Sequence, residues 1–545
     1  MSQVENLITQ HLDIWTQATE TKSAAGRGTR GKINLLGIQK LRELILEMAV
    51  RGLLVPQDPN DEPASELLIK IAAEKAQLIK DGKIKKTKPL PDITDDEKPF
   101  KLPKGWEWVR LGEVGNVFNG NSINERIKKE KYTNVEGLPF IATKDVGYGF
   151  EPLNYDNGVK IPVGEPKFVV AHSGAVLICA EGGSAGKKCG ITDQDICFGN
   201  KLFVNEPFAS IDPKFILAIY LSPSFYEKFS EVMTGIIGGI SRSNFINLPL
   251  QLPPLDEQTR IVAKVDELMA LCDALEAQTL DSIATHQTLV ETLLGSLVNP
   301  DNSADSHQAW LLIEQHFDVL FTTEHSIDTL KQTILQLAFD GRLVKWDKYS
   351  SDVIKNCLDF GPRNGFSPPE VQEDTGVFVL KLGATSYGVF NPAEVKNVKV
   401  CIDEDSHLWV QKGDILVQRG NSKDFVGSNL LIEKDIEGTI YPDLMMKLRT
   451  SERVIPEYLS LSLSSIASRQ YMWDRMTGTS GTMPKISKKV VESVPVNIPC
   501  IVDQNKTVSK IRELFCLCDQ IKTQLQTAQN TQAQLAQAVT NEALT

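Results

Sequence analysis

The sequence predicts an α+β fold, in which two mixed α/β domains are separated by long antiparallel helices of the coiled-coil type. The first observation behind this prediction is a long helical pattern that opens at 252–258 and again at 498–504. The second is a shorter helical pattern that occurs at 38–55 and at 327–344. The third is that the intervening segments consist of short apolar runs broken by Gly, Asn and Pro, which is typical of strands and turns.

The order of the repeated helices predicts a pseudo-twofold arrangement. In the middle of the chain the long helix comes first and the short helix second. At the termini the short helix lies near the beginning, at 35–52, and the long helix lies at the end. Pairing of helix 35–52 with the C-terminal helix would rebuild the central pair, so we expect the N- and C-terminal helices to lie together.

Length and composition narrow the class of protein. A chain of 545 residues is too long for one core, so we expect two to four domains. No apolar run reaches the length of a membrane span, and the first residues lack the layout of a signal peptide. The nine cysteines form no CxxC pair, which favours reduced thiols and a cytoplasmic location.

The negative charge is concentrated in one segment. The formal net charge is −12, and residues 251–345 alone carry 15 acidic and 5 basic side chains. The two globular segments are therefore near neutral. Any attraction to nucleic-acid phosphates must come from local basic patches, because the chain has no bulk positive field.

Several further helices are expected. Periodicity predicts one helix over 4–18, one over 64–81 and one over 213–230, where Asp-Pro is a good start signal. A Lys- and Pro-rich linker follows the second of these. The predicted organisation is an N-terminal helical arm with helix 35–52 at 1–100, a first mixed domain at 101–250, a central helical spacer at 251–345, a second mixed domain at 346–500 and a C-terminal helix at 501–545.

The long helix has the spacing of a coiled coil. Its apolar residues from Ile261 to Leu275 are separated by steps of 4, 3, 4 and 3. At 1.5 Å per residue, a helix of this kind spans about 60 Å. We expect it to act as a rigid spacer between the two mixed domains.

The motifs of the common enzyme classes are missing from the sequence. The Gly-rich run 181–188 resembles a phosphate-binding loop, but only three residues separate Gly182 from Gly186, and Lys188 replaces the Ser or Thr that would hold magnesium. No HExxH, GxSxG or Asn/Asp-Pro-Pro-aromatic run occurs. We expect a binding and organising subunit with no catalytic residues, no metal site and no cofactor of its own.

The long-helix motif resembles a known family. The run LPPLDEQTRIVAKVDEL at 252–268 is similar to the conserved region of type I restriction–modification specificity subunits, and the alternation of domain and helix resembles their architecture. The segments 37–68 and 98–114 resemble the long-armed class called type IB. The second copy departs from the pattern, because 498–504 lacks the second Pro and the Glu.

This resemblance implies a role in DNA recognition. Each mixed domain would be a target recognition domain for one half of a split, asymmetric double-stranded DNA sequence, and a twofold protein matches the symmetry of the duplex. The helical regions would space the domains and dock two methyltransferase subunits and two restriction subunits. S-adenosylmethionine, ATP and Mg would be bound by those partners.

Candidate DNA-binding residues lie on loops at matching places in the two domains. Base edges are read by polar and basic side chains, and phosphates by Lys, Arg and backbone amides. In the first domain the candidates are Ser184, Lys187, Lys188, Asn200, Lys201, Ser241, Arg242 and Asn244. In the second domain they are Arg419, Asn421, Lys423, Thr479, Ser480 and Lys485.

The sequence leaves two other interpretations open. One is a specificity subunit of a related system, in which methylase and nuclease are fused on one partner chain. The other is a scaffold that binds no DNA and carries two protein-binding lobes on a coiled coil. The acidic spacer suits this scaffold, and it equally suits a rod that meets a basic face of a partner.

Overall fold

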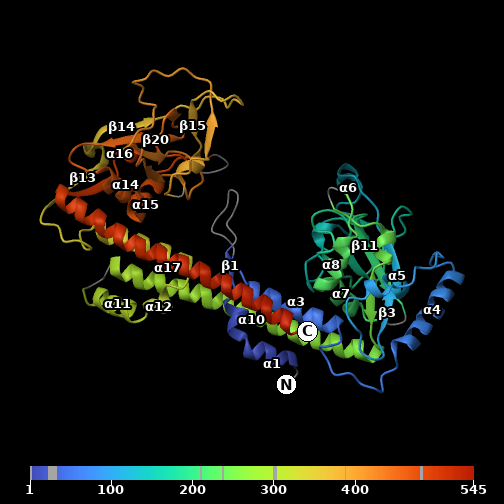
Figure 1. Cartoon of the computed structure of the whole chain (residues 1–545). Helices are drawn as coiled ribbons and strands as arrows, with labels where there is room; N and C mark the ends of the chain where they lie inside the picture. Colours follow the sequence, from blue (N-terminus) through green and yellow to red (C-terminus); the bar gives the residue numbers. More distant parts are fainter. Residues whose placement is uncertain are drawn as a thin grey trace. The chain divides into compact units, whose positions relative to one another are not determined.

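The computed structural model describes residues 3–21, 33–86, 88–208, 211–235, 238–298, 303–386, 388–478 and 483–544. The chain divides into two compact units, shown in Figure 1. The first contains the N-terminal residues up to 20, residues 33–279 and the C-terminal residues from 529. The second is built from residues 280–528. Mixed α/β domains and long helices are both present, so the predicted α+β fold is confirmed.

The first unit contains several helices besides its mixed domain. They are α1 (Gln3–Gln10), α2 (Leu12–Gln17), α3 (Leu36–Val50), α4 (Ala64–Lys80), the first part of α10 (Leu255–Val298) and the end of α17 (Ile501–Glu542). The helix predicted at 4–18 is interrupted at His11, whose φ of −120° and ψ of 26° are not helical. Helix α3 packs on the mixed domain, where the buried Glu47 accepts the backbone amide of Ser224 at 3.1 Å.

Two four-stranded sheets form the first mixed domain. The antiparallel sheet has the order β4-β11-β8-β9, from β4 (Gly115–Asn119), β11 (Leu202–Pro207), β8 (Val176–Cys179) and β9 (Cys189–Ile191). The second sheet has the order β6-β5-β10-β7, from β6 (Lys160–Ile161), β5 (Leu138–Ile141), β10 (Ile196–Phe198) and β7 (Val170–Ala171), with β5 and β10 parallel. A two-stranded ribbon, β3 (Glu107–Arg110) with β12 (Pro249–Leu252), joins the start and end of the domain.

The second mixed domain repeats this plan. Its antiparallel sheet has the order β14-β20-β17-β18, from β14 (Leu358–Asn364), β20 (Met445–Thr450), β17 (Ile415–Gln418) and β18 (Asn429–Leu431). The smaller sheet, β16-β15-β19, is built from β16 (Val395–Asn397), β15 (Phe378–Leu380) and β19 (Thr439–Ile440), with β15 and β19 parallel. The ribbon of β13 (Tyr349–Val353) with β21 (Pro495–Pro499) again joins the start and end.

A pair of helices lies beside the antiparallel sheet in each domain, and the first helix of each pair contacts that sheet. These are α7 (Pro213–Leu221) and α8 (Pro223–Glu231) in the first domain, and α14 (Pro456–Ser464) and α15 (Ile466–Trp473) in the second. The prediction of a single helix over 213–230 is therefore wrong, because two helices occupy this range. Ser222 adopts an extended conformation and caps α8 by accepting the amide of Phe225, as Ser465 does for Ser468 in α15. Pro223 has no amide hydrogen, so α7 ends before it.

The long helices begin in the same way in both units. Gln258 accepts the backbone amide of Asp212 at 3.3 Å and donates to the carbonyl of Pro253. Gln504 accepts the amide of Ile455 at 2.9 Å and donates to the carbonyl of Pro499. Both glutamines are fully buried. Each therefore ties the start of a long helix to the start of α7 or α14.

The short helices also make matching contacts. In the first unit Arg42 of α3 pairs with Asp273 and Glu276 of α10, at 2.5 and 2.6 Å. In the second unit Lys331 of α13 (Glu324–Phe339) pairs with Asp519 of α17 at 2.5 Å. In the first unit the tail of α17 is also near α3, because Arg51 donates to the carbonyl of Leu544 at 3.5 Å. Pairing of α3 with the whole C-terminal helix stays a prediction.

Candidate nucleic-acid interface

The first domain presents a loop between β8 and β9 that is held by backbone hydrogen bonds on two sides. On one side the amide of Ala180 donates to the carbonyl of Lys201 at 2.8 Å. On the other side the amide of Ile240 donates to the carbonyl of Ala180 at 3.0 Å. The amide of Gly182 reaches the carbonyl of Gly238 at 2.8 Å. Three segments that are distant in sequence therefore meet beside the 180–188 loop.

The second domain holds the loop between β17 and β18 in the same frame. The amide of Arg419 donates to the carbonyl of Leu444 at 2.7 Å, and the amide of Ile486 donates to the carbonyl of Arg419 at 2.9 Å. Gly420 and Lys485 form a β-bridge, as Glu181 and Gly239 do in the first domain. The two loops are therefore structural equivalents, as the sequence match between them predicts.

Each loop turns back at a glycine with positive φ. Gly186 has φ of +71°, and a Cβ added there would lie 2.6 Å from the ring of Phe229. Gly427 has φ of +80°, and a Cβ would lie 2.8 Å from the side chain of Met472. Glycine is needed at both places, because the backbone is left-handed and a helix lies directly behind it. The turn fixes the direction in which each loop leaves its sheet.

A side-chain tether links each loop to the turn that follows β5 or β15, but the two domains use different residues. In the first domain the ammonium of Lys188 donates to the carbonyl of Thr143 at 3.1 Å. In the second domain the amide of the fully buried Gln418 donates to the carbonyl of Leu382 at 2.9 Å. Thr143 and Leu382 occupy the same position after β5 and β15. The same connection is therefore made by a loop residue in one domain and by a strand residue in the other.

The tether of Gln418 is part of a larger polar network. Its amide nitrogen also lies 3.0 Å from the hydroxyls of Thr385 and Ser386. Its carbonyl oxygen accepts from the side chain of Asn421 at 2.7 Å. Asn421 in turn accepts the amide of Ser422 at 2.8 Å. Both ends of the Asn421 side chain are thus engaged in holding the loop.

Helix α15 supports the second loop from behind. Arg469 donates to the carbonyl of Asp424 at 2.6 Å and to the hydroxyl of Ser428 at 3.0 Å. Burial lowers the pKa of Arg469 to about 10, so the group remains cationic at neutral pH. Trp473 donates its indole N–H to the carbonyl of Val426 at 3.0 Å. The loop is therefore fixed on three sides before any ligand binds.

The structure places most of the candidate residues on exposed parts of these loop sets. The exposed candidates are Lys187, Asn200, Lys201, Ser241, Arg242, Asn244, Lys423 and Lys485. Arg419 and Ser184 are half-buried. Lys187 lies over the ring of Tyr226, 5.5 Å from its centroid, and Lys201 pairs with Glu181 at 3.7 Å. Thr479 and Ser480 lie outside the described residues.

Three candidates already have framework contacts. Lys188 is the tether described above, and its ammonium also lies 5.0 Å from the centroid of the Tyr148 ring. Asn421 is engaged through both ends of its amide. Ser241 caps α9 (Arg242–Ile246) by accepting the amide of Asn244 at 3.1 Å. These three side chains stabilise the conformation of their loops. Contact with a ligand stays a prediction for all fourteen candidates.

Sequence reasoning did not identify Gln418 and Arg469. A signal for Gln418 was present, because it is a polar residue at the end of the apolar strand Ile415–Gln418, where the first domain has Cys179. No comparable signal marks Arg469, since it lies on a helix with many polar residues. Its role depends on how α15 packs against the loop.

Among the residues that the structure describes, no group of three or more His, Cys, Asp or Glu side chains is arranged to hold a metal ion. In the same described parts, no helix combines the length and the apolar character that crossing a membrane requires. Two alike domains with differing side chains on the same loop frame define a duplicated recognition protein.

Comparison with known proteins identifies the family. Residues 103–285 match the family model described as the type I restriction modification DNA specificity domain. The chain is 38% identical to the specificity subunit of the type I restriction enzyme EcoEI and 35% identical to that of EcoAI, both from Escherichia coli. Each alignment covers 99% of this chain and 100% of the relative. The chain belongs to the family of type I restriction–modification specificity subunits.

A solved structure also aligns with this chain. It concerns the complex assembly and conformational transition of the type I R-M system, and the match has 18% identity and a TM-score of 0.49. It covers 82% of this chain and 99% of the other. By its full-length relatives, the protein is the specificity subunit of a type I restriction–modification system, which favours DNA recognition over a scaffold that binds no DNA.

Proposed function

We propose that this subunit binds a double-stranded DNA target in two separate parts, each read by one mixed domain, and that it has no catalytic activity of its own. The proposal rests on the backbone hydrogen bonds that hold the equivalent loops of the two domains in the same way. The backbone hydrogen bonds around 180–188 and around 419–427 match, while the exposed side chains on them differ. One frame with two sets of side chains is suited to two different half-sequences.

The chemistry of the loops fits a groove of DNA. Lys187 and Arg242 in the first domain, and Arg419, Lys423 and Lys485 in the second, supply cationic donors for phosphates and guanine edges. Because the loops are fixed by buried tethers and by glycine turns, little conformational entropy is lost when they bind. Binding is expected to weaken as salt rises, since phosphate contacts release counterions.

We further propose that two methyltransferase subunits and two restriction subunits assemble on this chain. The partners would supply S-adenosylmethionine, ATP and Mg, and the complex would act in the cytoplasm. Family membership supports this arrangement. In it, the present chain selects the DNA sequence and its partners carry out methylation and cleavage.

Methylation mapping tests the division of labour between the domains. In the assembled methyltransferase, Arg419→Ala with Lys423→Ala should relax the sequence of one half-site and leave the other intact. Lys187→Ala with Arg242→Ala should do the reverse. Loss of a base contact costs about 1–3 kcal/mol, which corresponds to a loss of about 5- to 150-fold in discrimination at that half-site. Equal relaxation of both half-sites by either pair would contradict the proposal.

A further inference from the structure

The helices α1 and α2 have an internal copy. Helices α11 (Ser303–Gln315) and α12 (Phe317–Leu320) are also separated by one residue, His316, whose φ of −118° and ψ of 24° match those of His11. The aligned residues Ile8 and Ile313 are both buried. Each pair precedes the short helix of its unit, α3 or α13. The duplication therefore extends to the N-terminal helices.

In the first unit, the arm covers one face of α10. The carboxylate of Glu5 pairs with Lys264 at 2.6 Å. The loop after α3 brings Asp61 to Arg260, with two contacts at 2.5 and 3.1 Å. Lys264 also pairs with Glu267 on its own helix at 3.0 Å. Acidic side chains from outside the helix thus neutralise both cations of this face.

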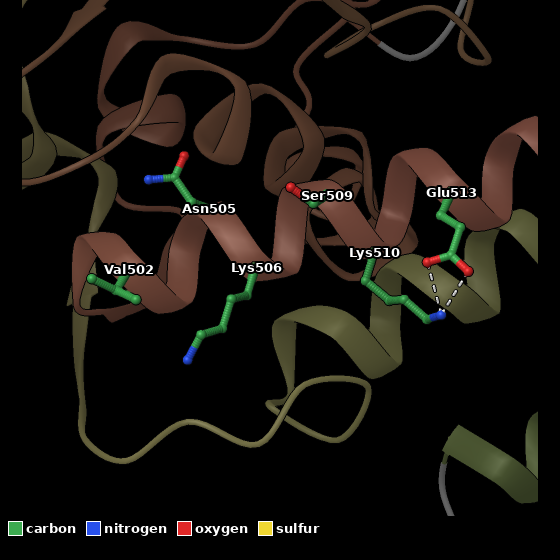
Figure 2. A pocket seen from close by; sticks show the side chains of 6 residues that line it. All are labelled: Val502, Asn505, Lys506, Ser509, Lys510 and Glu513. Carbon is green, nitrogen blue, oxygen red and sulfur yellow. Dashed lines mark hydrogen bonds and ion pairs between the residues drawn. The ribbon is translucent and has the colours of Figure 1, made fainter.

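The equivalent face of α17 in the second unit is covered less. Asp503 on the same helix raises the pKa of Lys506, and Asp347, just before β13, lies close enough to help. Lys506 and Lys510 stand at the positions of Arg260 and Lys264, counted from the matching helix starts. Among the described residues, their ion pairs are with Asp503 at 3.0 Å and with Glu513 at 2.9 Å, both on α17 itself. Figure 2 shows this face, a shallow hollow of about 560 Å³ lined by Val502, Asn505, Lys506, Ser509, Lys510 and Glu513.

The α17 face is less covered than the α10 face because the second half of the chain lacks two acidic contacts that the first half has. Trp310 on α11 replaces Glu5, and it is 55% exposed. Trp106 packs against Gly52 in the first unit, and Trp346 packs against Gly341 in the second. Only four residues separate Gly341 from Trp346, so the region that carries Asp61 in the first half has no counterpart in the second.

We propose that the α17 face, Val502–Glu513, docks an acidic segment of one methyltransferase subunit, in the way that Glu5 and Asp61 cover α10. The inference rests on the proposed function. Lys506 and Lys510 select acidic ligands by charge, and Val502, which is 61% exposed, adds apolar contact. A second copy of this chain is a poorer occupant, because its own Glu5 and Asp61 are already paired with Lys264 and Arg260.

A charge-reversal experiment tests the α17 face. Lys506→Glu with Lys510→Glu is compared with Lys412→Glu with Lys434→Glu, which makes the same change of net charge on exposed lysines of the second domain. Each full-length chain is mixed with the purified methyltransferase subunit and examined by native mass spectrometry. The α17 variant should bind one methyltransferase subunit fewer, with affinity at that site at least about tenfold weaker, and the control should assemble like the unchanged chain.

The possible outcomes separate this inference from the proposed function. If the unchanged chain binds no methyltransferase subunit, the proposed function fails. If the chain with both α17 substitutions assembles as fully as the control, the α17 face is not the docking site and the proposed function stands. Ultracentrifugation of the chain alone provides a second check. Self-association that disappears in the α17 variant would overturn the inference in favour of a second copy.

Discussion

Lys214 of α7 and Asp266 of α10 form an ion pair at 2.5 Å, and at the equivalent positions of the second unit the charges are exchanged. There Glu457 of α14 pairs with Arg512 of α17. The two halves thus use the same site with opposite polarity. An exchange of polarity makes each domain compatible with its own long helix and repelled by the long helix of the other half, which favours correct pairing of two similar halves.

A double-mutant cycle tests this ion pair. Asp266→Arg should destabilise the first unit by about 0.5–1 kcal/mol, because it places two cations together at a half-exposed site. Adding Lys214→Glu should restore most of the loss, since the pair then has the polarity of Glu457 and Arg512. Urea unfolding of the two single variants and the double variant measures the coupling. Additive losses in the double variant would show that the pair contributes nothing.

Gln504 is expected to contribute strongly to the stability of the second unit. Gln504→Ala leaves the buried amide of Ile455 without its acceptor, which costs about 1–3 kcal/mol. Gln520→Ala is a matched control on the same helix, because Gln520 is exposed and its side-chain contact among the described residues is a 4.0 Å one to Cys516. Thermal unfolding compares the melting temperatures of the two variants, and that of Gln504→Ala should be lower. Equal melting temperatures would mean that the link between α17 and α14 is unimportant.

The two loop tethers predict opposite specificity defects. Gln418→Leu removes the partners of Leu382, Thr385 and Asn421, so the 419–427 loop should loosen and the half-site of the second domain should relax. Lys188→Met should loosen the 180–188 loop and affect the other half-site. Methylation mapping in the assembled complex checks both. Unchanged specificity in a folded Gln418→Leu variant would contradict the role of the tether.

The contact between Glu97 and Arg110 predicts a pH dependence of stability. Hydrogen bonding from Arg110 lowers the pKa of Glu97 from its usual 4.5 to about 2. A lowered pKa in the folded state means that the contribution is complete above pH 4.5 and disappears as the pH falls toward 2. Glu97→Gln should therefore be less stable than the unchanged chain at pH 7, with a difference that narrows below pH 4.5. Urea unfolding across this range measures the difference, and a constant difference would exclude the effect.

Lengthening the long helices tests the spacer hypothesis. One heptad inserted after Thr279 in α10 and after Ala528 in α17 adds about 10 Å of helix, or about three base pairs of DNA. The gap between the two methylated half-sites should change accordingly. Methylated positions that keep their original gap would count against a spacer role for these helices.

The helical framework was largely predictable, because its signals are local. The Pro and Gln spacing at 252–258 and 498–504 marks both helix starts, and the structure gives Gln258 and Gln504 the same hydrogen bonds. The copy of α1 and α2 was also visible in principle as Gln-His at 10–11 and 315–316, but the match is short. The predicted pairing of helix 35–52 with the C-terminal helix stays a prediction, and no signal in the sequence indicated that Arg42 of this helix pairs with Asp273 and Glu276 of α10.

The loops were predictable as sets but their individual roles were not. Matching sequence around 180–188 and 419–427 located both loops, because strand, glycine and turn recur in the same order. Whether a side chain faces outward or supports the loop depends on tertiary contacts. Lys188 and Lys187 are neighbours, yet one is bound to the Thr143 carbonyl and the other is exposed.

The segment between Gly52 and Trp106 is an addition that only one half of this protein possesses. A shortened chain, in which Val55 is joined to Gly105, would have the same four-residue spacing between glycine and tryptophan in both halves. Such a chain would also expose Arg260, since Asp61 lies within the deleted stretch. The inserted segment therefore makes the two halves of the protein unequal. In the first half it covers the start of α10, and in the second half the start of α17 has no such cover.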